Sequence, residues 1–421
     1  MNAQRLTLLV ATGLIATGCG AAVTVTGHAP ATAVHGGGSN SSLTLAQASA
    51  APSTARTPSS AAAPSATPAH SATPAPTTPT APQVIVVADQ TNMSAATFEV
   101  ALLTSNGDVL ASAQVPQDAR WTIGVGPRAA YWVTGGKLRT LNEHGVVTTL
   151  ATVPLTESGR VVLSPDGSQW AYATTSTSPS NGIITNRLYR GGIGRPAQLV
   201  AERTSDANHP TADAPTQWQY YPLAWTAEGI LIERQPVGGC GCGTPFDMQM
   251  TAAYAAFIDP LSGAATTLGA STSCPMSGIG ADATLACFHT TSTGTSDSLR
   301  FINGAHTTHT YALSGRNDGG DAIFNGSTLA YATVPGSAGG CGGPDWRPDT
   351  SLHVMDVTSG DARIIGGTGL QPVAWLSDGR VLATLSVAHA AATTSSIVAV
   401  DPASGSLQTL FNRSFTVVGV A

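Results

Sequence analysis

The stretch PVAWLSDGRVLATLSVAHAAATTSSIVAVDPASGSLQTL, residues 372–410, holds the pattern on which most of the remaining chain is a variation. It contains four short apolar runs. The first two runs are separated by SDG at residues 377–379, and the last two by PASG at residues 402–405. Both sequences are typical of tight turns between antiparallel strands. Four short strands with two tight hairpins and one looser connection make one blade of a β-propeller.

Two turn sequences recur along the chain at a spacing of about 40 to 60 residues, close to the length of a propeller blade. The turn between the first and second strands recurs at residues 164–167, 226–229, 280–282, 325–326 and 377–379. The turn between the third and fourth strands recurs at residues 105–108, 142–145, 262–263, 359–361 and 404–405. The segments between these turns are short and rich in Val, Thr and Tyr, which favours strands over helices. We therefore expect residues 83–421 to form an almost all-β domain.

The two ends of this domain complement each other. Residues 84–88, 98–103 and 109–115 supply only three strands, whereas the chain ends with an additional apolar segment at residues 415–420. If that segment joins the first blade as its innermost strand, the ring closes and no sheet edge is left exposed. The sequence thus predicts an all-β, seven-bladed β-propeller closed by its C-terminal strand, with six or eight blades as alternatives.

Two stretches, LSPDGSQWAYAT at residues 163–174 and AWLSDGRVLAT at residues 374–384, resemble the repeat of TolB-like propellers, whose core reads roughly W-S-P-D-G-x-x-I-A-F. The second stretch lacks the proline, and the other repeats keep little beyond the turn and the strand pattern. The resemblance implies a propeller for most of residues 83–421. It implies no particular function, because proteins with this repeat have many roles.

The N-terminal residues read as an export signal. Residues 1–18 combine a cationic start at Arg5 with an apolar run at residues 6–15 that is too short to span a bilayer permanently. ATGC at residues 16–19 resembles the bacterial lipobox, in which small residues precede a cysteine that is lipidated before the signal is removed; alanine stands here where the family usually has leucine. The resemblance implies a lipid on Cys19. An ordinary secretory signal is the alternative.

Residues 19–82 are rich in Ala, Pro, Ser, Thr and Gly, a composition that predicts a disordered linker between the lipidated cysteine and the propeller. We therefore expect the domain to be held on the extracytoplasmic side of the cell membrane, which it contacts only through the anchor. The net charge is -6 and no stripe of Lys or Arg is present, so nucleic acid is not an expected partner.

The long connections of the predicted ring all belong to one face. In a propeller, the connections between second and third strands and the links between blades lie on one face, and the tight hairpins lie on the other. The long connections here are residues 175–186, 204–220, 235–251, 290–296 and 334–350. Binding residues commonly lie on loops displayed by a rigid scaffold, so this face is the candidate binding surface.

Aromatic residues make up only 5% of the chain, yet several lie in or beside these connections. They are Trp218, Tyr220, Tyr221, Phe246 and Trp346. Clustered aromatics beside polar groups are typical of surfaces that recognise a protein, a peptide or a glycan. The alternative is that they pack the loops onto the ring. Asp345 and Arg347, on either side of Trp346, are candidate partner contacts or a local ion pair.

Five cysteines follow the lipobox, and extracytoplasmic cysteines usually oxidise. Cys274 and Cys287 fall on the first two strands of one blade, near enough in register to form a disulfide. For the other three, the alternatives are a bond from Cys240 or Cys242 to Cys341, a bond between Cys240 and Cys242, or free thiols. Because the number is odd, one cysteine must remain unpaired.

Neither a metal site nor a catalytic site is expected. Cys-x-Cys with one distant cysteine lacks a fourth zinc ligand at a usable spacing, and no calcium-loop pattern is present. The inner strands are predicted at residues 121–125, 160–163, 222–225, 274–279, 321–324, 371–375 and 415–420. They carry essentially only Arg160 and Asp321 as charged groups, which disfavours a metal-centred hydrolase or lactonase. The sequence also contains no G-x-S-x-G elbow.

The expected function is that of a binding or scaffold module in the cell envelope, which recognises an envelope protein, a peptide or a glycan without a cofactor. The alternative is an envelope enzyme whose site is assembled from the cysteine-rich loops of the fourth and sixth blades. A deep pocket of converging polar groups on the candidate face would indicate the enzyme, and a broad aromatic surface would indicate a partner.

Overall fold

The computed structural model describes residues 83–89, 92, 94–154, 160–178, 180–205, 218–236, 255–269, 274, 276–291, 295–304, 306–336, 345–389 and 393–421, without the side chains of 235–236 and 314–316. These residues belong to one of the two compact units into which the chain divides. Helical structure in the described part is limited to two short 3-10 helices, η1 (Gln117–Thr122) and η3 (Arg347–Asp349). No helix there is both long and apolar enough to cross a membrane.

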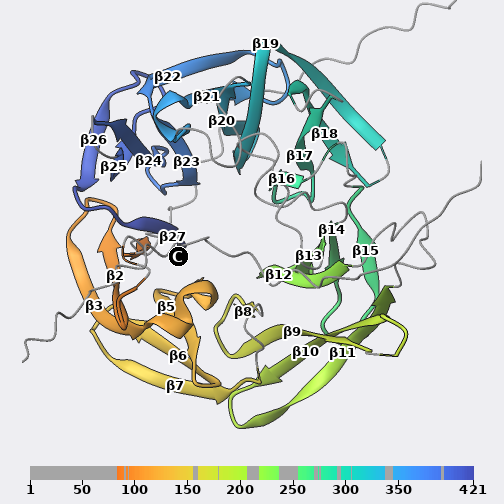
Figure 1. Cartoon of the computed structure of the whole chain (residues 1–421). Helices are drawn as coiled ribbons and strands as arrows, with labels where there is room; N and C mark the ends of the chain where they lie inside the picture. The colour runs from red at the N-terminus through yellow and green to blue at the C-terminus, as the bar shows by residue number, and fades with distance from the viewer. Residues whose placement is uncertain are drawn as a thin grey trace, which may run out of the picture. The chain divides into compact units, whose positions relative to one another are not determined.

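The strands form antiparallel sheets arranged around a central axis, which makes the described domain a β-propeller (Figure 1). From the axis outward, the first blade is β27 (Thr416–Val420), β1 (Val84–Ala88), β2 (Thr97–Thr104) and β3 (Val109–Pro116). The second is β4 (Gly124–Gly126), β5 (Ala129–Thr134), β6 (Lys137–Asn142) and β7 (Val147–Thr152). The third is β8 (Val161–Leu163), β9 (Gln169–Thr177), β10 (Ile184–Gly192) and β11 (Arg195–Ser205).

The fourth blade is β12 (Trp218–Thr226), β13 (Gly229–Pro236), β14 (Ala255–Ile258) and β15 (Ala265–Thr267). A continuous sheet follows, made of β16 (Met276–Ile279), β17 (Leu285–Thr290), β18 (Ser296–Asn303), β19 (His306–Asn325), β20 (Thr328–Pro335), β21 (Ser351–Asp356) and β22 (Ala362–Thr368). The last blade is β23 (Leu370–Trp375), β24 (Val381–Ala388), β25 (Thr393–Val400) and β26 (Leu407–Phe411).

The continuous sheet contains two blades that share one strand. The first part of β19 pairs with β18 as far as Asn317, and the part from Asn317 onward pairs with β20. The same strand is therefore the outer strand of one blade and the inner strand of the next. Counted in this way, the described strands fall into seven groups of four, in agreement with the predicted number of blades.

The C-terminal strand closes the ring, as the sequence predicts. β27 pairs antiparallel with β1, with Ile85 opposite Val420 and Ala88 opposite Thr416. The pairing continues beyond the strand ends, because the backbone N–H of Val84 donates to the carbonyl oxygen of Ala421 at 2.9 Å and the N–H of Ala421 donates back at 2.8 Å. The first blade is thus built from both ends of the domain.

The hydrophobic core lies between the blades. Successive side chains of a strand point to opposite faces of its sheet. Val84, Val86 and Ala88 of β1 accordingly pack with Trp132 of the second blade. Ile85 and Val87 face the other way, where the same cluster contains Leu382 and Ile397 of the last blade. This two-sided burial explains why β1 is apolar at every position, VIVVA, instead of alternating.

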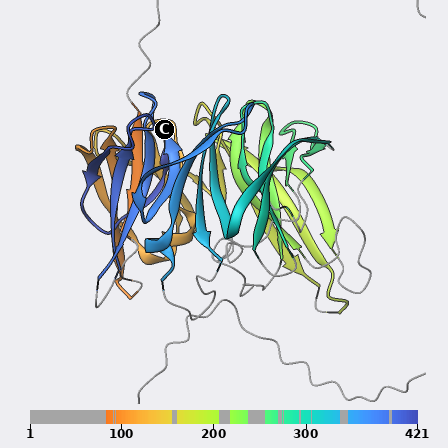
Figure 2. The ribbon, with the colours of Figure 1, turned by 90° about the horizontal axis from the view of Figure 1, so that it is seen from above.

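The hairpins between third and fourth strands share one sequence, Asp-x-x-Ser-Gly, in three blades. It occurs at residues 259–263, 356–360 and 401–405. In the last of these, Oδ1 of Asp401 accepts the backbone N–H groups of Ala403 at 2.8 Å and Ser404 at 2.7 Å. These hairpins lie on the same edge of the ring as the C-terminus, the upper edge in Figure 2. We call this edge the turn face, and the opposite edge, which carries the interblade links and the connections between second and third strands, the loop face.

The hairpin glycine also joins neighbouring blades. Gly263 has φ of +70°, and a Cβ there would overlap the carbonyl oxygen of Val200 on β11 of the preceding blade. Gly379 has φ of +85° but no atom within 4 Å of such a Cβ. We therefore expect Gly263→Ala to lower the free energy of unfolding by about 2 kcal/mol more than Gly379→Ala does, because both strain the backbone but only the first forces the blades apart. Urea unfolding of the two variants measures the difference, and equal losses would contradict this packing.

One inner strand differs from the prediction. The sequence predicts it at residues 121–125, whereas η1 extends through Thr122 and β4 starts at Gly124. The Thr122 hydroxyl donates to the carbonyl oxygens of Ala119 at 2.8 Å and Val133 at 3.0 Å, which holds the 3-10 turn against β5. As a result, the side chain of Trp121 is turned outward and is 63% exposed.

Candidate binding face

Parts of two connections predicted on the loop face are extensions of the strands. The connection predicted at residues 175–186 contains the end of β9 and the start of β10, which are joined by a short turn with a bond from the N–H of Ser178 to the carbonyl oxygen of Ile183 at 2.8 Å. β11 and β12 likewise extend into residues 204–220 from both sides. Four predicted site residues, Phe246, Cys240, Cys242 and Cys341, lie outside the described residues.

Trp218 and Tyr220 belong to the core, which corrects their assignment to an exposed ligand surface. They are 5% and 6% exposed, and their ring centroids are 5.1 Å apart. The buried amide of Asn186 donates to the carbonyl oxygen of Trp218 at 2.9 Å and accepts the N–H of Tyr220 at 3.2 Å. β12 is thereby fixed to the third blade. The packing alternative therefore describes these two aromatics.

Tyr221 points to the other side of β12 and is half-buried. The Arg160 guanidinium lies over its ring, with Cζ 5.2 Å from the centroid and Nη1 donating to the tyrosine oxygen at 3.4 Å. Arg160 also lines a cavity of about 260 Å³ at the axis of the ring, between β4, β8, β12 and β27. Arg160 is the one charged residue among the residues that line this cavity. The cavity thus has a single fixed positive charge and apolar walls.

Asp321 is the acidic group predicted on an inner strand, and it lies on β19 in the sixth blade. It has φ of 52°, and one carboxylate oxygen accepts a hydrogen bond from Nε2 of Gln371 on β23 at 3.2 Å. Burial raises the pKa of Asp321 to about 6, and the bond from Gln371 opposes that shift only in part. Arg160 and Asp321 therefore lie in different blades, the third and the sixth.

The raised pKa of Asp321 predicts a specific pH dependence of stability. The folded protein binds the carboxyl proton of Asp321 more tightly than the unfolded chain does. The stability that this proton contributes to the fold is therefore present below about pH 4 and is lost as pH rises through about 6. Asp321→Asn keeps an acceptor for Gln371, and asparagine tolerates the positive φ. Between pH 4 and 7, the free energy of unfolding of this variant should therefore rise by about 2 kcal/mol relative to that of the natural chain. Thermal unfolding across this range measures the gain, with Asp349→Asn as the control. A constant difference between variant and natural chain would contradict it.

Asp345, Trp346 and Arg347 form a small cluster at η3, on the loop face of the sixth blade. Arg347 Nη1 lies 3.2 Å from Oδ1 of Asp345, and its Cζ lies 5.6 Å from the Trp346 ring centroid. Although burial acts to raise it, hydrogen bonds from Thr393 and Arg347 hold the pKa of Asp345 below its ordinary value. The Arg347 side chain is 54% exposed. The ion-pair alternative is therefore realised, and it leaves the guanidinium open to solvent.

Trp121 is a candidate that sequence reasoning missed. It lies on η1, in the link between the first two blades and so on the loop face, and Cζ of Arg120 lies 5.8 Å from its ring. Its place in a predicted inner strand concealed its exposure. The loop face therefore displays the exposed ring of Trp121, whose neighbour Arg120 is itself buried, and, in a different blade, the half-buried Trp346 beside the exposed Arg347.

The predicted disulfide between Cys274 and Cys287 is confirmed, with a Cα–Cα distance of 5.2 Å. Both cysteines are buried in the cluster between the fourth and fifth blades, so the bond is structural. In the part of the chain that the structure describes, no group of three or more His, Cys, Asp or Glu side chains is placed to hold a metal ion.

No protein-family model and no curated protein matches this sequence. Among solved structures, the periplasmic gluconolactonase of Pseudomonas aeruginosa is 13% identical, with a TM-score of 0.43 over 80% of this chain and 100% of its own. The acylaminoacyl peptidase of Pyrococcus horikoshii is 8% identical, with a TM-score of 0.46 over 78% of this chain and 50% of its own. A chain of a nidogen/laminin complex is 11% identical, with a TM-score of 0.36 over 66% of this chain and 91% of its own. These likenesses are distant, and the propeller assignment rests on the strand pairing described above.

Proposed function

We propose that this protein is an extracytoplasmic, lipid-anchored binding or scaffold module, which recognises an envelope protein, a peptide or a glycan through its loop face. The observation that carries the proposal is that this face presents the exposed Trp121 in one blade and Trp346 with the exposed Arg347 in another. Trp and Arg are the residues most enriched among those that dominate binding energies. Trp121 is 63% exposed, and burial of its large ring against a partner would remove apolar area from water and so favour binding.

The described ring begins at Gln83, away from the loop face. Gln83 Nε2 donates to the carbonyl oxygen of Trp375 at 3.5 Å, and its Oε1 accepts the N–H of Ser377. Ser377 belongs to a tight turn, so Gln83 lies at the turn face. The described ring therefore begins on the edge opposite the proposed binding surface.

The charged groups near the axis give less support to an enzyme. A general acid and a general base must both reach the reacting atoms, within about 3 Å or through one water. The Arg160 guanidinium lies over the ring of Tyr221 in the third and fourth blades. Asp321 lies three blades from Arg160, in the sixth blade, and accepts a hydrogen bond from Gln371. Among the described residues, this leaves the axis without a paired acid and base.

The proposal is tested by capturing crosslinked partners from an envelope extract with the full-length protein. Trp121→Ala combined with Trp346→Ala should reduce retention of a specific partner about 10-fold or more, as expected for the loss of aromatic anchors. Leu407→Ala is the matched control, because Leu407 is an exposed apolar residue of the turn face. Equal retention by both variants would overturn the assignment to the loop face.

Anchoring at Cys19 is tested separately. Cells that express the protein are labelled with a clickable palmitate analogue, and the protein is then followed through detergent extraction. The natural chain should carry the label and remain with the membrane fraction, whereas Cys19→Ser should be unlabelled and released. Labelling of the Cys19→Ser variant would exclude this residue as the lipid site.

A further inference from the structure

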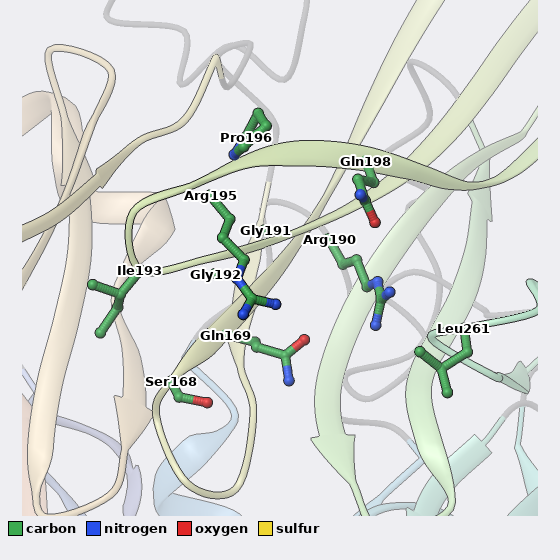
Figure 3. A pocket seen from close by; sticks show the side chains of 10 residues that line it. All are labelled: Ser168, Gln169, Arg190, Gly191, Gly192, Ile193, Arg195, Pro196, Gln198 and Leu261. Carbon is green, nitrogen blue, oxygen red and sulfur yellow. The ribbon is translucent and has the colours of Figure 1, made fainter.

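A second recessed site lies on the turn face, between the outer strands of the third blade and the fourth blade (Figure 3). Its volume is about 490 Å³, within the range of ordinary ligand sites. Its polar walls are the side chains of Gln169, Arg190, Arg195 and Gln198, and Ile193 and Leu261 stand at its edge. No loop-face residue lines it.

Strand register explains why these polar side chains converge. Arg190 on β10 is opposite Gln198 on β11, and Gly192 is opposite both Gln169 and Arg195. Directly paired residues share a face of the sheet. Because Gly192 has no side chain, the centre of this group is empty. A Cβ on Gly192 would lie 3.8 Å from Cγ of Gln169 and 3.9 Å from Cδ of Arg195, which are ordinary contacts.

The neighbouring residues show which way this face points. Trp170 and Gly191 alternate with Gln169 and Arg190, and a Cβ on Gly191 would lie 2.6 Å from the Trp170 ring. Trp170 packs in the cluster that contains Tyr131 of the second blade. The arginine-bearing face must therefore open toward the fourth blade, whose hairpin contributes Leu261.

The side chains that line the site carry two positive charges and no negative one. Within the described chain, neither Arg190 nor Arg195 has a hydrogen-bonded acidic partner, whereas Arg187 on the same strand is paired with Glu202 at 2.6 Å. Arg190 interacts electrostatically with Asp259, whose Oδ1 accepts hydrogen bonds from the backbone N–H and the hydroxyl of Ser262 at 2.6 and 2.8 Å. These bonds, more than Arg190, hold the pKa of Asp259 below its ordinary value. The Asp259 carboxylate thus stabilises the hairpin to which it belongs. Asp166 lies beside the site as well, but its carboxylate accepts hydrogen bonds from Ser164 and Ser168.

We propose that this site binds an acidic peptide segment of a partner protein, with a carboxylate held between Arg190 and Arg195. Guanidinium groups bind carboxylates in a bidentate geometry, and the amides of Gln169 and Gln198 supply further donors. Ile193 and Leu261, 60% and 77% exposed, provide contact for apolar residues that flank the carboxylate.

An anionic bilayer fits this face less well than a peptide does. The hairpins around the same edge carry acids, among them Asp166, Asp356 and Asp401, and hydrogen bonds from their own turns lower the pKa of each. The chain as a whole has a net charge of -6. A lipid surface would meet this acidic edge, whereas a single peptide segment can occupy the basic pocket alone.

The test is fluorescence anisotropy with the full-length protein and a labelled octapeptide in which two glutamates are flanked by leucines. Arg190→Gln and Arg195→Gln should each weaken binding about 10-fold or more, the loss expected for one charge-assisted contact. Gly192→Leu should do the same without a change of charge, because its side chain fills the centre of the site. Arg203→Gln is the matched control: it removes one positive charge from β11 outside the pocket and should leave the affinity within about 2-fold.

A second set of measurements identifies the ligand class. The glutamine version of the peptide should bind about 10-fold more weakly or worse, and added salt should weaken only the glutamate version. Citrate that binds as tightly as the peptide, or anionic phospholipid vesicles that bind through the same arginines while the peptide does not, would overturn the peptide assignment. Equal weakening by Arg203→Gln would overturn the site. The Trp121 and Trp346 variants should bind this peptide normally, so failure here is distinguishable from failure of the loop-face proposal.

Discussion

A chain that ends at Arg413 is expected to lose cooperative folding. The truncation removes β27, so β1 loses the strand that covers its inner edge, although all five of its residues are buried in the intact ring. Phe415 and Val417 also leave the cluster that they form with Leu382 and Ile397. Burial of such side chains contributes about 2 kcal/mol each, and the unpaired edge adds to the loss. The sum approaches the whole stability of a typical domain, about 5 to 15 kcal/mol.

Urea unfolding followed by circular dichroism measures this loss, with size-exclusion chromatography to detect association through the open edge. A circular permutant is the matched control. Because Val84 and Ala421 are hydrogen-bonded, a short glycine linker can join residues 421 and 83, and new ends can be made in the turn at residues 105–108. The permutant keeps every strand and should fold. A truncated chain that unfolds at the natural midpoint would show that β27 does not close the ring.

Replacement of both Cys274 and Cys287 by alanine is expected to destabilise the domain by about 3 kcal/mol. The bond closes a short loop, with a sequence separation of 13, and a cross-link of that length restricts the unfolded chain by an amount of this order. It also fastens β16, an inner strand of only four residues, to β17. The loss should appear as a lower midpoint in urea.

Reduction provides the control for the disulfide. A reductant should lower the stability of the natural chain to that of the double variant, and it should leave the double variant unchanged. If the reduced natural chain keeps its full stability, the bond contributes nothing and the prediction fails. A further loss in the double variant would point to other disulfides among the remaining cysteines.

The fold was predictable because propeller strands and turns carry local signals. The Gly-containing turns fixed the blade boundaries, and the surplus strand at the C-terminus indicated how the ring closes. The Asp that begins each Asp-x-x-Ser-Gly hairpin, at residues 259, 356 and 401, is a weaker sequence signal than the Ser-Gly that follows it. Its role becomes clear once its carboxylate is seen to accept the N–H groups of the turn.

The candidate site was predicted less well, because exposure depends on which face of a strand meets the next blade. Trp218, Tyr220 and Tyr221 are close in sequence, yet the first two share a buried face and the third does not. Because side chains alternate between the two faces of a strand, the sequence alone could have assigned Tyr221 to the face opposite Trp218 and Tyr220. Trp121 was misplaced because a 3-10 turn held by Thr122 replaces the expected strand. The pocket around Gly192 depends on the register of three strands, which no local sequence pattern specifies.

Site-specific photocrosslinking tests the central claim, that the loop face is where this propeller binds its partner. Benzoylphenylalanine is introduced at Ala96 or Asp349 on the loop face, and at Val147 or Leu407 on the turn face, all in exposed positions away from the Arg190 pocket. We predict that adducts with a common envelope partner form from the two loop-face positions and not from the two turn-face positions. Adducts only from Val147 and Leu407, or equally from all four positions, would contradict the account.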